Sequence, residues 1–388
     1  MMKVALRGRV VTDYEVWNEG FVVLEEGFIH DVLPDELGLP ADVEVRDCGE
    51  ALILPGFVDL QVNGAFGIDV ATTPERLPEL SEALLATGTT SYLPTVISSP
   101  ERLYRECLPQ LSREIRSPDQ RGASPLGVHL EGPFIDPAHR GAHPEASVRA
   151  PDVGLLEWLL ELAPVRLLTL APELPGAGAV MEFARNRGVV VSAGHSGIEL
   201  DEAYVALDRY VASVTHLFNA MEGLHHRNPG LAGAAFAHPR VVCGLIADGF
   251  HVHPEIVALA FRMLGPDRLY FVTDSVAAAG MDGGAYPLAD VEVHLEGGTP
   301  KLASGVIAGS VLTGVDAFRN ILAFTDCTLP EAARMASSTP ARLIGEDGRK
   351  GRLLGGYEAD LTILFPDLSV AEVWKAGRLV HRAGERTA

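Results

Sequence analysis

Four residues able to bind a metal ion or to move a proton lie at the ends of apolar, strand-like runs in this sequence. They are Glu131 in HLEGPF, His195 in SAGHS, His216 in THLFNAM and Asp274 in VTDS. One carboxylate and two imidazoles suit Zn²⁺ or a similar divalent ion and leave a coordination position open for water. A carboxylate beside such an ion can accept a proton and return it later to a departing amine. We therefore predict Glu131, His195 and His216 as metal ligands and Asp274 as the general base.

Each of these residues alone has a simpler explanation, because a strand-end histidine often caps a loop or satisfies a core hydrogen bond. The four residues together favour a catalytic metal site, provided that the fold brings them to one place. Eight apolar β-type runs alternate with stretches long enough for a helix, at residues 53–62, 91–97, 127–132, 165–172, 189–195, 212–218, 241–248 and 269–275. Eight strands close a parallel (β/α)8 TIM-type barrel, whose carboxyl-end loops converge on one mouth.

An open doubly wound sheet is the competing fold. It would require a glycine-rich phosphate fingerprint after the first strand, and PGFVDLQVNGAFG lacks GxGxxG. After the eighth run, YPLADVEVHLEGG to VIAGS is typical of an inserted hairpin. The barrel with helices between its strands is thus the predicted fold.

Both ends of the chain differ from the middle in their residue pattern. Short β-rich runs such as VALRGRVV and ADLTILF are punctuated by glycine and charge. We predict a small β-sandwich domain built from both termini, residues 1–54 plus 355–388, beside a catalytic barrel at residues 55–354. Two unrelated edge extensions are the alternative, although terminal segments commonly meet at the surface.

The overall charge restricts the class of partner. Asp and Glu outnumber Lys and Arg by 52 to 31, and the resulting charge of −21 repels a polyphosphate backbone. Nucleic acid is therefore excluded, and a small anionic substrate would need a local cluster of donors. The opening MMKVALRGRVVTDYEVW is broken by charge, and no stretch of about 18 uncharged apolar residues is present. We expect a soluble, cytoplasmic protein without a membrane segment.

The motifs together resemble one family. LPGFVDLQVNG, HLEGPFI with GAH shortly after it, GHS, THLFNAM, RNPGLAG, IADGFHV, VTDS and IAGS occur in the order found in the N-acetylglucosamine-6-phosphate deacetylases of the amidohydrolase superfamily. The resemblance covers essentially the whole chain. It implies metal-dependent deacetylation of N-acetyl-D-glucosamine 6-phosphate to D-glucosamine 6-phosphate and acetate.

The resemblance also implies roles for particular residues. Glu131, His195 and His216 match the metal ligands and Asp274 the catalytic acid and base. His143 in GAH matches the residue that polarises the acetyl carbonyl, which fits a donor aimed at a developing oxyanion. Without the resemblance, an ordinary loop histidine would be the better interpretation of His143, and His139 is expected at the surface. Positions matching the substrate contacts are Ala142, His143, Asn219, Ala220, Arg227, His251, Ile307 and Ala308.

The first strand and the resemblance also indicate how many metal ions and how many subunits to expect. Many amidohydrolases carry HxH on the first strand for a second ion, whereas this chain has Gln61 and Asn63 there. Amides are weak metal ligands, so one ion per subunit is expected, with Zn ahead of Fe, Co or Mn. Asp59 on the same strand is expected to be structural. The resemblance further implies a homodimer in which Arg227 reaches the phosphate across the interface.

Three alternatives stay open. N-acetylgalactosamine 6-phosphate differs from the gluco substrate in one hydroxyl configuration, which a sequence pattern does not resolve. A dihydroorotase-like cyclic-amide hydrolase would usually show HxH and a bridging lysine. A non-catalytic barrel kept for binding would be expected to have lost at least one of Glu131, His195, His216 or Asp274, and all four are present.

Overall fold

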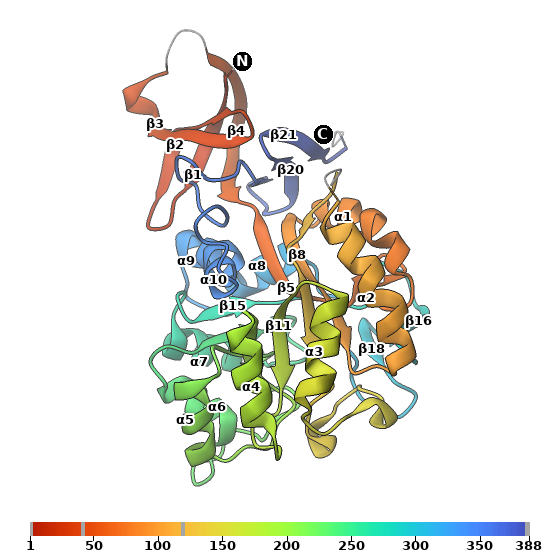
Figure 1. Cartoon of the computed structure of the whole chain (residues 1–388). Helices are drawn as coiled ribbons and strands as arrows, with labels where there is room; N and C mark the ends of the chain where they lie inside the picture. Colours follow the sequence, from red (N-terminus) through yellow and green to blue (C-terminus); the bar gives the residue numbers. More distant parts are fainter. Residues whose placement is uncertain (1–2, 40–42, 118–120, 385–388) are drawn as a thin grey trace.

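The computed structural model describes residues 3–39, 43–117 and 121–384 and contains the predicted barrel (Figure 1). Its parallel strands, in their order around the sheet, are β5 (Phe57–Val62), β8 (Thr89–Ile97), β10 (Val128–Glu131), β11 (Val165–Leu170), β12 (Val190–Ala193), β13 (Ser213–Val214), β14 (Val242–Leu245) and β15 (Leu269–Phe271). A parallel bridge between Val62 and Ser275 brings the first strand beside the end of the last. All eight apolar runs of the sequence are therefore confirmed as barrel strands.

Helices follow the strands and cover the barrel. They are α1 (Leu77–Leu85), α2 (Glu101–Ile115), α3 (Val153–Leu162), α4 (Ala177–Asn186), α5 (Leu200–Arg209), α6 (Gly230–Ala237), α7 (Pro254–Leu264), α8 (Gly314–Phe324), α9 (Leu329–Ala333) and α10 (Thr339–Leu343). In α2 the buried Leu103, Cys107 and Leu111 recur every fourth residue and form the face that packs on the core. The Asp152 carboxylate accepts the Leu155 N–H and so caps the start of α3.

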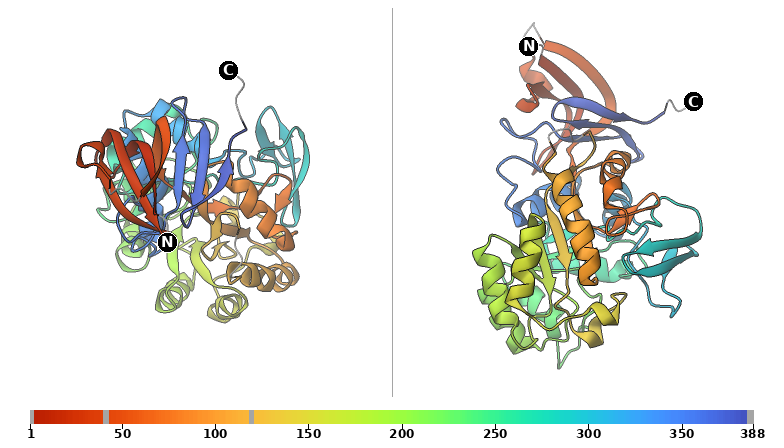
Figure 2. Two further views of the ribbon diagram at one scale, coloured as in Figure 1. Left: turned by 90° about the horizontal axis from the view of Figure 1, so that it is seen from above. Right: turned by 45° about the vertical axis from the view of Figure 1, so that its right-hand side comes forward.

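The two ends of the chain share one sheet. Its strands, in spatial order, are β21 (Arg378–Arg382), β20 (Val370–Lys375), β19 (Leu361–Leu364), β4 (Val43–Pro55), β1 (Lys3–Val11), β2 (Val16–Glu25) and β3 (Phe28–Pro34). The antiparallel pair β19 and β4 joins the carboxyl-terminal strands to the amino-terminal ones. Figure 1 shows these strands in dark blue and red above the barrel, and Figure 2 shows them side by side from above. The predicted joining of the two termini is thus confirmed as a separate sheet, and hydrogen bonding runs continuously across its seven strands.

The inserted segment forms an antiparallel sheet of its own. Its strands are β16 (Gly284–Leu288), β17 (Val291–Glu296) and β18 (Thr299–Lys301), one strand more than the predicted hairpin. The right-hand view of Figure 2 shows this sheet standing at the side of the barrel. Short strands complete the fold: β9 (Ser124–Pro125) pairs with β8, and β6 (Gly64–Ala65) pairs with β7 (Ile68–Asp69). No described helix is both long and apolar enough to cross a membrane.

A buried charge cluster connects the terminal sheet to the barrel. The Asp360 carboxylate lies 2.7 Å from Lys350 Nζ and 3.1 Å from Lys375 Nζ. Lys375 Nζ also donates to the Thr90 main-chain oxygen at 3.3 Å and to Ser124 Oγ at 2.6 Å, both on the barrel side. Burial alone would raise the pKa of the Asp360 carboxyl. The ammonium groups of Lys375 and Lys350 outweigh burial and lower this pKa to about 2.

Candidate active site

The predicted metal ligands and base lie together at the carboxyl ends of the barrel strands. Glu131 is the last residue of β10, and His195 and His216 each follow their strand, β12 or β13, by two residues. Asp274 follows β15 by three residues. His195, His216 and Asp274 have positive φ angles of 52°, 29° and 48°, which are unusual for residues other than glycine. Such strained backbone is often found at functional sites.

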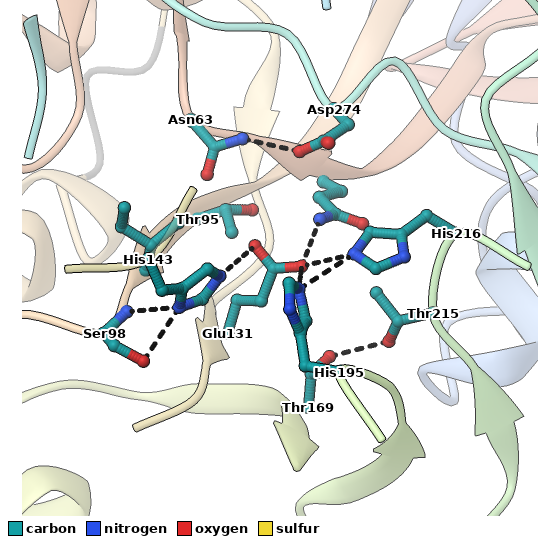
Figure 3. Close-up of polar contacts among 12 residues, drawn as sticks. Asn63, Thr95, Ser98, Glu131, His143, Thr169, His195, Thr215, His216 and Asp274 are labelled. Atoms are coloured by element: carbon teal, nitrogen blue, oxygen red, sulfur yellow. Dashed lines mark hydrogen bonds and ion pairs between the residues drawn. The ribbon is translucent and has the colours of Figure 1, made fainter. Parts of the chain in front are cut away.

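The donor atoms of the three predicted ligands converge (Figure 3). Glu131 Oε1 lies 3.2 Å from His195 Nε2 and 2.9 Å from His216 Nε2, and the two Nε2 atoms are 3.1 Å apart. All three side chains are buried. One carboxylate oxygen and two imidazole nitrogens that face one another in a buried pocket are a donor set suited to a divalent ion. The residues present therefore fit the expected metal.

Main-chain and charge contacts set the protonation of the cluster. His195 Nδ1 lies 2.9 Å from the main-chain oxygen of His139, an acceptor, so that nitrogen carries the proton and Nε2 keeps its lone pair. Burial and the neighbouring His143 lower the pKa of His195 to about 4. Burial alone would raise the pKa of Glu131, but the close contacts of its carboxylate with the ring nitrogens of His143, His195 and His216 hold that pKa well below the usual value.

His139, which was expected at the surface, lies there partly buried. Its side chain is 19% exposed and lies 2.6 Å from Asp136 and 3.3 Å from Glu222. The spacing of three residues between Asp136 and His139 was the signal available in the sequence, because it allows a side-chain contact within one turn.

The two amides on the first strand bind the carboxylates of the site. Gln61 Nε2 donates to Glu131 Oε1 at 2.8 Å, and Asn63 Nδ2 donates to Asp274 Oδ1 at 2.7 Å. Both amides are buried. They therefore orient a predicted metal ligand and the predicted base. Asp59 on the same strand accepts the Thr273 hydroxyl at 2.6 Å, which matches the structural role expected for it.

Asp274 is placed to hold or release a proton near neutral pH. Its side chain is buried, and burial together with the charge of Glu131 raises its pKa to about 7. The main-chain oxygen of Asp274 accepts the Ser310 N–H at 2.8 Å, so the IAGS segment lies against it. Gly309 has φ 63°, and a Cβ there would approach the Asp274 oxygen to 2.9 Å. The close approach of the two segments thus requires glycine.

His143 is oriented as a hydrogen-bond donor toward the cavity. The Ser98 N–H donates to His143 Nδ1 at 3.2 Å, and the Ser98 hydroxyl lies 2.8 Å from the same nitrogen (Figure 3). Because Nδ1 accepts, the proton of the neutral ring is on Nε2, which lies 3.5 Å from Glu131 Oε2. Sequence reasoning missed Ser98, since its contribution comes partly from a main-chain group.

A cavity of about 320 Å³ opens over these residues. Glu131, His143, His195, His216 and Asp274 all line it. The predicted substrate contacts that line it as well are Ala142, Asn219, Ala220, His251 and Ile307. His251 is held by Asp248, whose Oδ2 lies 2.7 Å from His251 Nδ1. Asp248 was also missed, although it precedes His251 by three residues in IADGFHV.

Two predicted contacts lie outside the described lining of this cavity. Ala308 is fully buried, and Arg227 is an exposed residue whose Nη1 lies 2.7 Å from His226 Nε2. Arg227 therefore does not complete the cavity of its own chain in the part that the structure describes.

Comparison with known proteins identifies the family. The model of the amidohydrolase family matches residues 52–380, and the chain is 36% identical to an N-acetylglucosamine-6-phosphate deacetylase of Bos taurus over 98% of this chain and 94% of that protein. The chain belongs to the amidohydrolase family. Within this family, it is 34% identical to a Bacillus subtilis (strain 168) protein of the same name, with 93% of this chain and 92% of that one covered. It is also 34% identical to an N-acetylgalactosamine-6-phosphate deacetylase of Escherichia coli O157:H7, with 96% and 98% covered.

Solved structures of the amidohydrolase family show the same fold. The chain is similar to an N-acetyl-D-glucosamine-6-phosphate deacetylase mutant of Mycobacterium smegmatis in complex with N-acetyl-D-glucosamine-6-phosphate, with a TM-score of 0.91, 31% identity and 98% and 99% of the two chains covered. It is also similar to the Thermotoga maritima N-acetylglucosamine-6-phosphate deacetylase, with a TM-score of 0.87, 32% identity and 98% and 100% covered.

Proposed function

We propose that this amidohydrolase removes the acetyl group from N-acetyl-D-glucosamine 6-phosphate, giving D-glucosamine 6-phosphate and acetate. The observation that carries the proposal is the buried set of Glu131, His195 and His216 in one cavity with Asp274. The names of the relatives, and the ligand named for the Mycobacterium smegmatis structure, support the choice of substrate. A barrel kept only for binding is disfavoured because every residue that the chemistry needs is present and mutually close.

Glu131, His195 and His216 would hold one divalent ion, which we propose to be Zn²⁺ rather than Fe, Co or Mn. When bound, such an ion supplies a Lewis acid that brings the pKa of water from about 16 toward 7. Gln61 and Asn63 donate to Glu131 and Asp274, and this supports a single ion. The first strand would then orient the carboxylates of Glu131 and Asp274 and would not supply ligands for a second ion.

The proton transfers fall to Asp274 and His143. Asp274 lines the cavity and is oriented by the Asn63 amide, so it would accept a proton from the attacking water and return it to the departing amine. The His143 Nε2–H would donate to the acetyl oxygen as negative charge develops there, because Ser98 occupies Nδ1 and Nε2 makes only a long contact, 3.5 Å, with Glu131 Oε2. Asp274 would thus act as a proton acceptor, and His143 would act as a hydrogen-bond donor to the amide.

The remaining contacts would bind the sugar phosphate. We propose that Ala142, Asn219, Ala220, His251 and the main chain at Ile307 and Ala308 position the sugar. His251 and Asn219 would receive the phosphate with Arg227, whose planar fork suits a phosphate oxygen pair. Because Arg227 lies outside the cavity of its own chain, we propose that it acts in a homodimer, on the site of the neighbouring subunit. Phosphosugars as substrates also support a cytoplasmic location.

N-acetylgalactosamine 6-phosphate is the second candidate substrate. The Escherichia coli O157:H7 relative carries that substrate in its name and is 34% identical to the chain. The two sugars differ in one hydroxyl, so acetate release from both phosphates by the same preparation decides between them. A kcat/KM higher for the galacto compound would replace the proposed substrate without changing the chemistry.

The 6-phosphate provides a direct test of the proposal. Removing it should lower kcat as well as raise KM, because binding energy at the phosphate also orients the acetamide against the catalytic groups. We expect kcat/KM for free N-acetylglucosamine to be at least about a hundredfold lower than for the 6-phosphate. Acetate release from both compounds is the measurement. Comparable values would show that Asn219, His251 and Arg227 do not bind a phosphate.

A further inference from the structure

A second hollow lies at the other end of the barrel from the metal-binding residues. It measures about 740 Å³, and the residues that line it lead into β13, β14 and β15 at their amino ends. The hollow is lined by five arginines from separate parts of the chain, Arg185, Arg209, Arg240, Arg268 and Arg342. They come from the ends of α4 and α5, from the loops before β14 and β15, and from α10, which packs on β15.

The charge of this hollow opposes that of the molecule. Its five arginines face two lining aspartates, Asp208 and Asp267, a formal excess of three positive charges. The whole chain carries −21. A concave surface of one sign, bounded by protein of low dielectric, focuses its field and concentrates ions of the opposite sign. A local positive field of this kind does not follow from the composition of the chain.

The two aspartates are already engaged. Asp267 Oδ1 lies 2.9 Å from Nη1 of Arg334, which is not one of the lining residues. Asp208 Oδ1 lies 3.2 Å from His238 and 3.5 Å from Arg240. Their charge therefore leaves most of the lining arginines uncompensated.

Main-chain oxygens hold several of these guanidinium groups in place without neutralising them. Arg268 donates to the oxygens of Ala235, Phe236 and Met263 at 3.4, 3.3 and 3.1 Å. Arg342 donates to the Asp267 oxygen, and Arg185 donates to the Arg209 oxygen. Within the described ranges, Arg185, Arg209, Arg268 and Arg342 have no carboxylate partner. Positioned guanidinium groups with free positive charge are the usual receptors of phosphate groups.

We propose that this arginine hollow binds a small phosphorylated molecule with at least two anionic groups. A small ligand with at least two anionic groups would balance the excess of three positive charges. A long polyanion is disfavoured because the rest of the surface would repel it. The hollow lies away from the catalytic cavity and shares no lining residue with it, so this proposal stands independently of the proposed function.

Calorimetric titration of the metal-loaded protein with fructose 1,6-bisphosphate, at a fixed physiological salt concentration, tests the proposal. The main variant is the pair Arg209→Gln and Arg240→Gln, since both side chains are exposed and neither donates to a buried main-chain oxygen. Saturable binding by the unchanged protein and a Kd at least about tenfold weaker in this variant are expected. The matched control is the pair Arg102→Gln and Arg262→Gln on α2 and α7, exposed arginines that each lie beside a carboxylate.

The control pair, a second variant and a second probe ligand distinguish the possible results. The control pair should keep a Kd within about twofold of the unchanged protein. Thermal unfolding checks that the main variant is folded, and Arg342→Gln alone is a second variant that should also weaken binding. Equal affinities in the main and control variants, or no saturable binding by the unchanged protein, would overturn the site. Equally tight binding of tricarballylate, a tricarboxylate probe, would overturn its assignment to phosphate.

Discussion

His195 and His143 take opposite tautomers because different main-chain groups contact their Nδ1 atoms. An oxygen acceptor, that of His139, faces His195 Nδ1 and leaves the Nε2 lone pair for a metal ion. An N–H donor, that of Ser98, faces His143 Nδ1 and puts the proton on Nε2. The same side chain thus becomes a ligand in one place and a hydrogen-bond donor in the other.

Asp274→Asn is the sharpest residue-level test of the mechanism. The substitution keeps size and the contact to Asn63 but removes the proton acceptor, so kcat should fall by at least about a hundredfold. Metal content should not change, because Asp274 is not one of the converging ligands. Steady-state kinetics and elemental analysis of the same preparation measure both. Near-normal kcat would assign the base to another group, and loss of metal would make Asp274 a ligand.

Metal stoichiometry tests the interpretation of the first strand. Purified protein should hold about one divalent ion per chain, since the amides of Gln61 and Asn63 donate to carboxylates instead of completing another site. His195→Ala or His216→Ala should lose both the ion and activity. Elemental analysis after extensive dialysis is the measurement. Two ions per chain that survive dialysis would contradict the single-ion site.

At the scale of elements, the strands could be predicted from sequence and the connecting contacts could not. The barrel strands are rich in apolar residues because both of their faces are buried, and β5 and β8 are buried at every position. Glu131 stands out because a carboxylate ending such a run has no packing role. Ser98 and the main-chain oxygen of His139 gave no such signal, since a main-chain contact does not depend on residue type.

The buried cluster around Asp360 was also invisible in the sequence. Lys350 and Lys375 lie 10 and 15 residues from it, and the fold brings both to one carboxylate. Asp360→Asn should lower the free energy of unfolding by about 3–5 kcal/mol, because it leaves the buried Lys375 ammonium without a carboxylate partner, whereas Lys350 keeps its contact with Glu358 at 2.5 Å. Urea unfolding at neutral pH measures this. Glu106→Gln, which removes half of an exposed ion pair with Arg102, is the control and should change stability little.

The same cluster predicts a dependence on pH. The pKa of Asp360 is about 2 in the folded chain and about 4 when unfolded, so its contribution is complete above about pH 4. It is lost as the pH falls from 4 toward 2, when the folded state must take up a proton. The difference in unfolding free energy between the unchanged protein and Asp360→Asn should therefore shrink over that range. A difference that stays constant down to pH 2 would mean that the carboxylate charge does not stabilise the fold.

At the scale of the whole molecule, the position of Arg227 requires explanation. Arg227 is exposed and does not line the cavity of its own chain. In a two-fold dimer each subunit can donate the same residue to the other, because the contact is repeated by symmetry. The proposed donation of Arg227 therefore makes activity a property of the pair of subunits.

Mixed dimers test this donation. Arg227→Ala and Asp274→Asn chains should each be nearly inactive alone, but in a mixed dimer one site combines an intact Asp274 with an intact Arg227 from the partner, while the other has neither. Random pairing makes half of the dimers mixed and half of their sites complete, so co-expression should restore about a quarter of the unchanged activity. An arginine that acted within its own chain would leave no complete site in any pairing. The measurement compares the co-expressed pair with the sum of the two separate variants, after tagged chains have shown that mixed dimers form. Absence of recovery in those dimers would place the action of Arg227 within its own subunit.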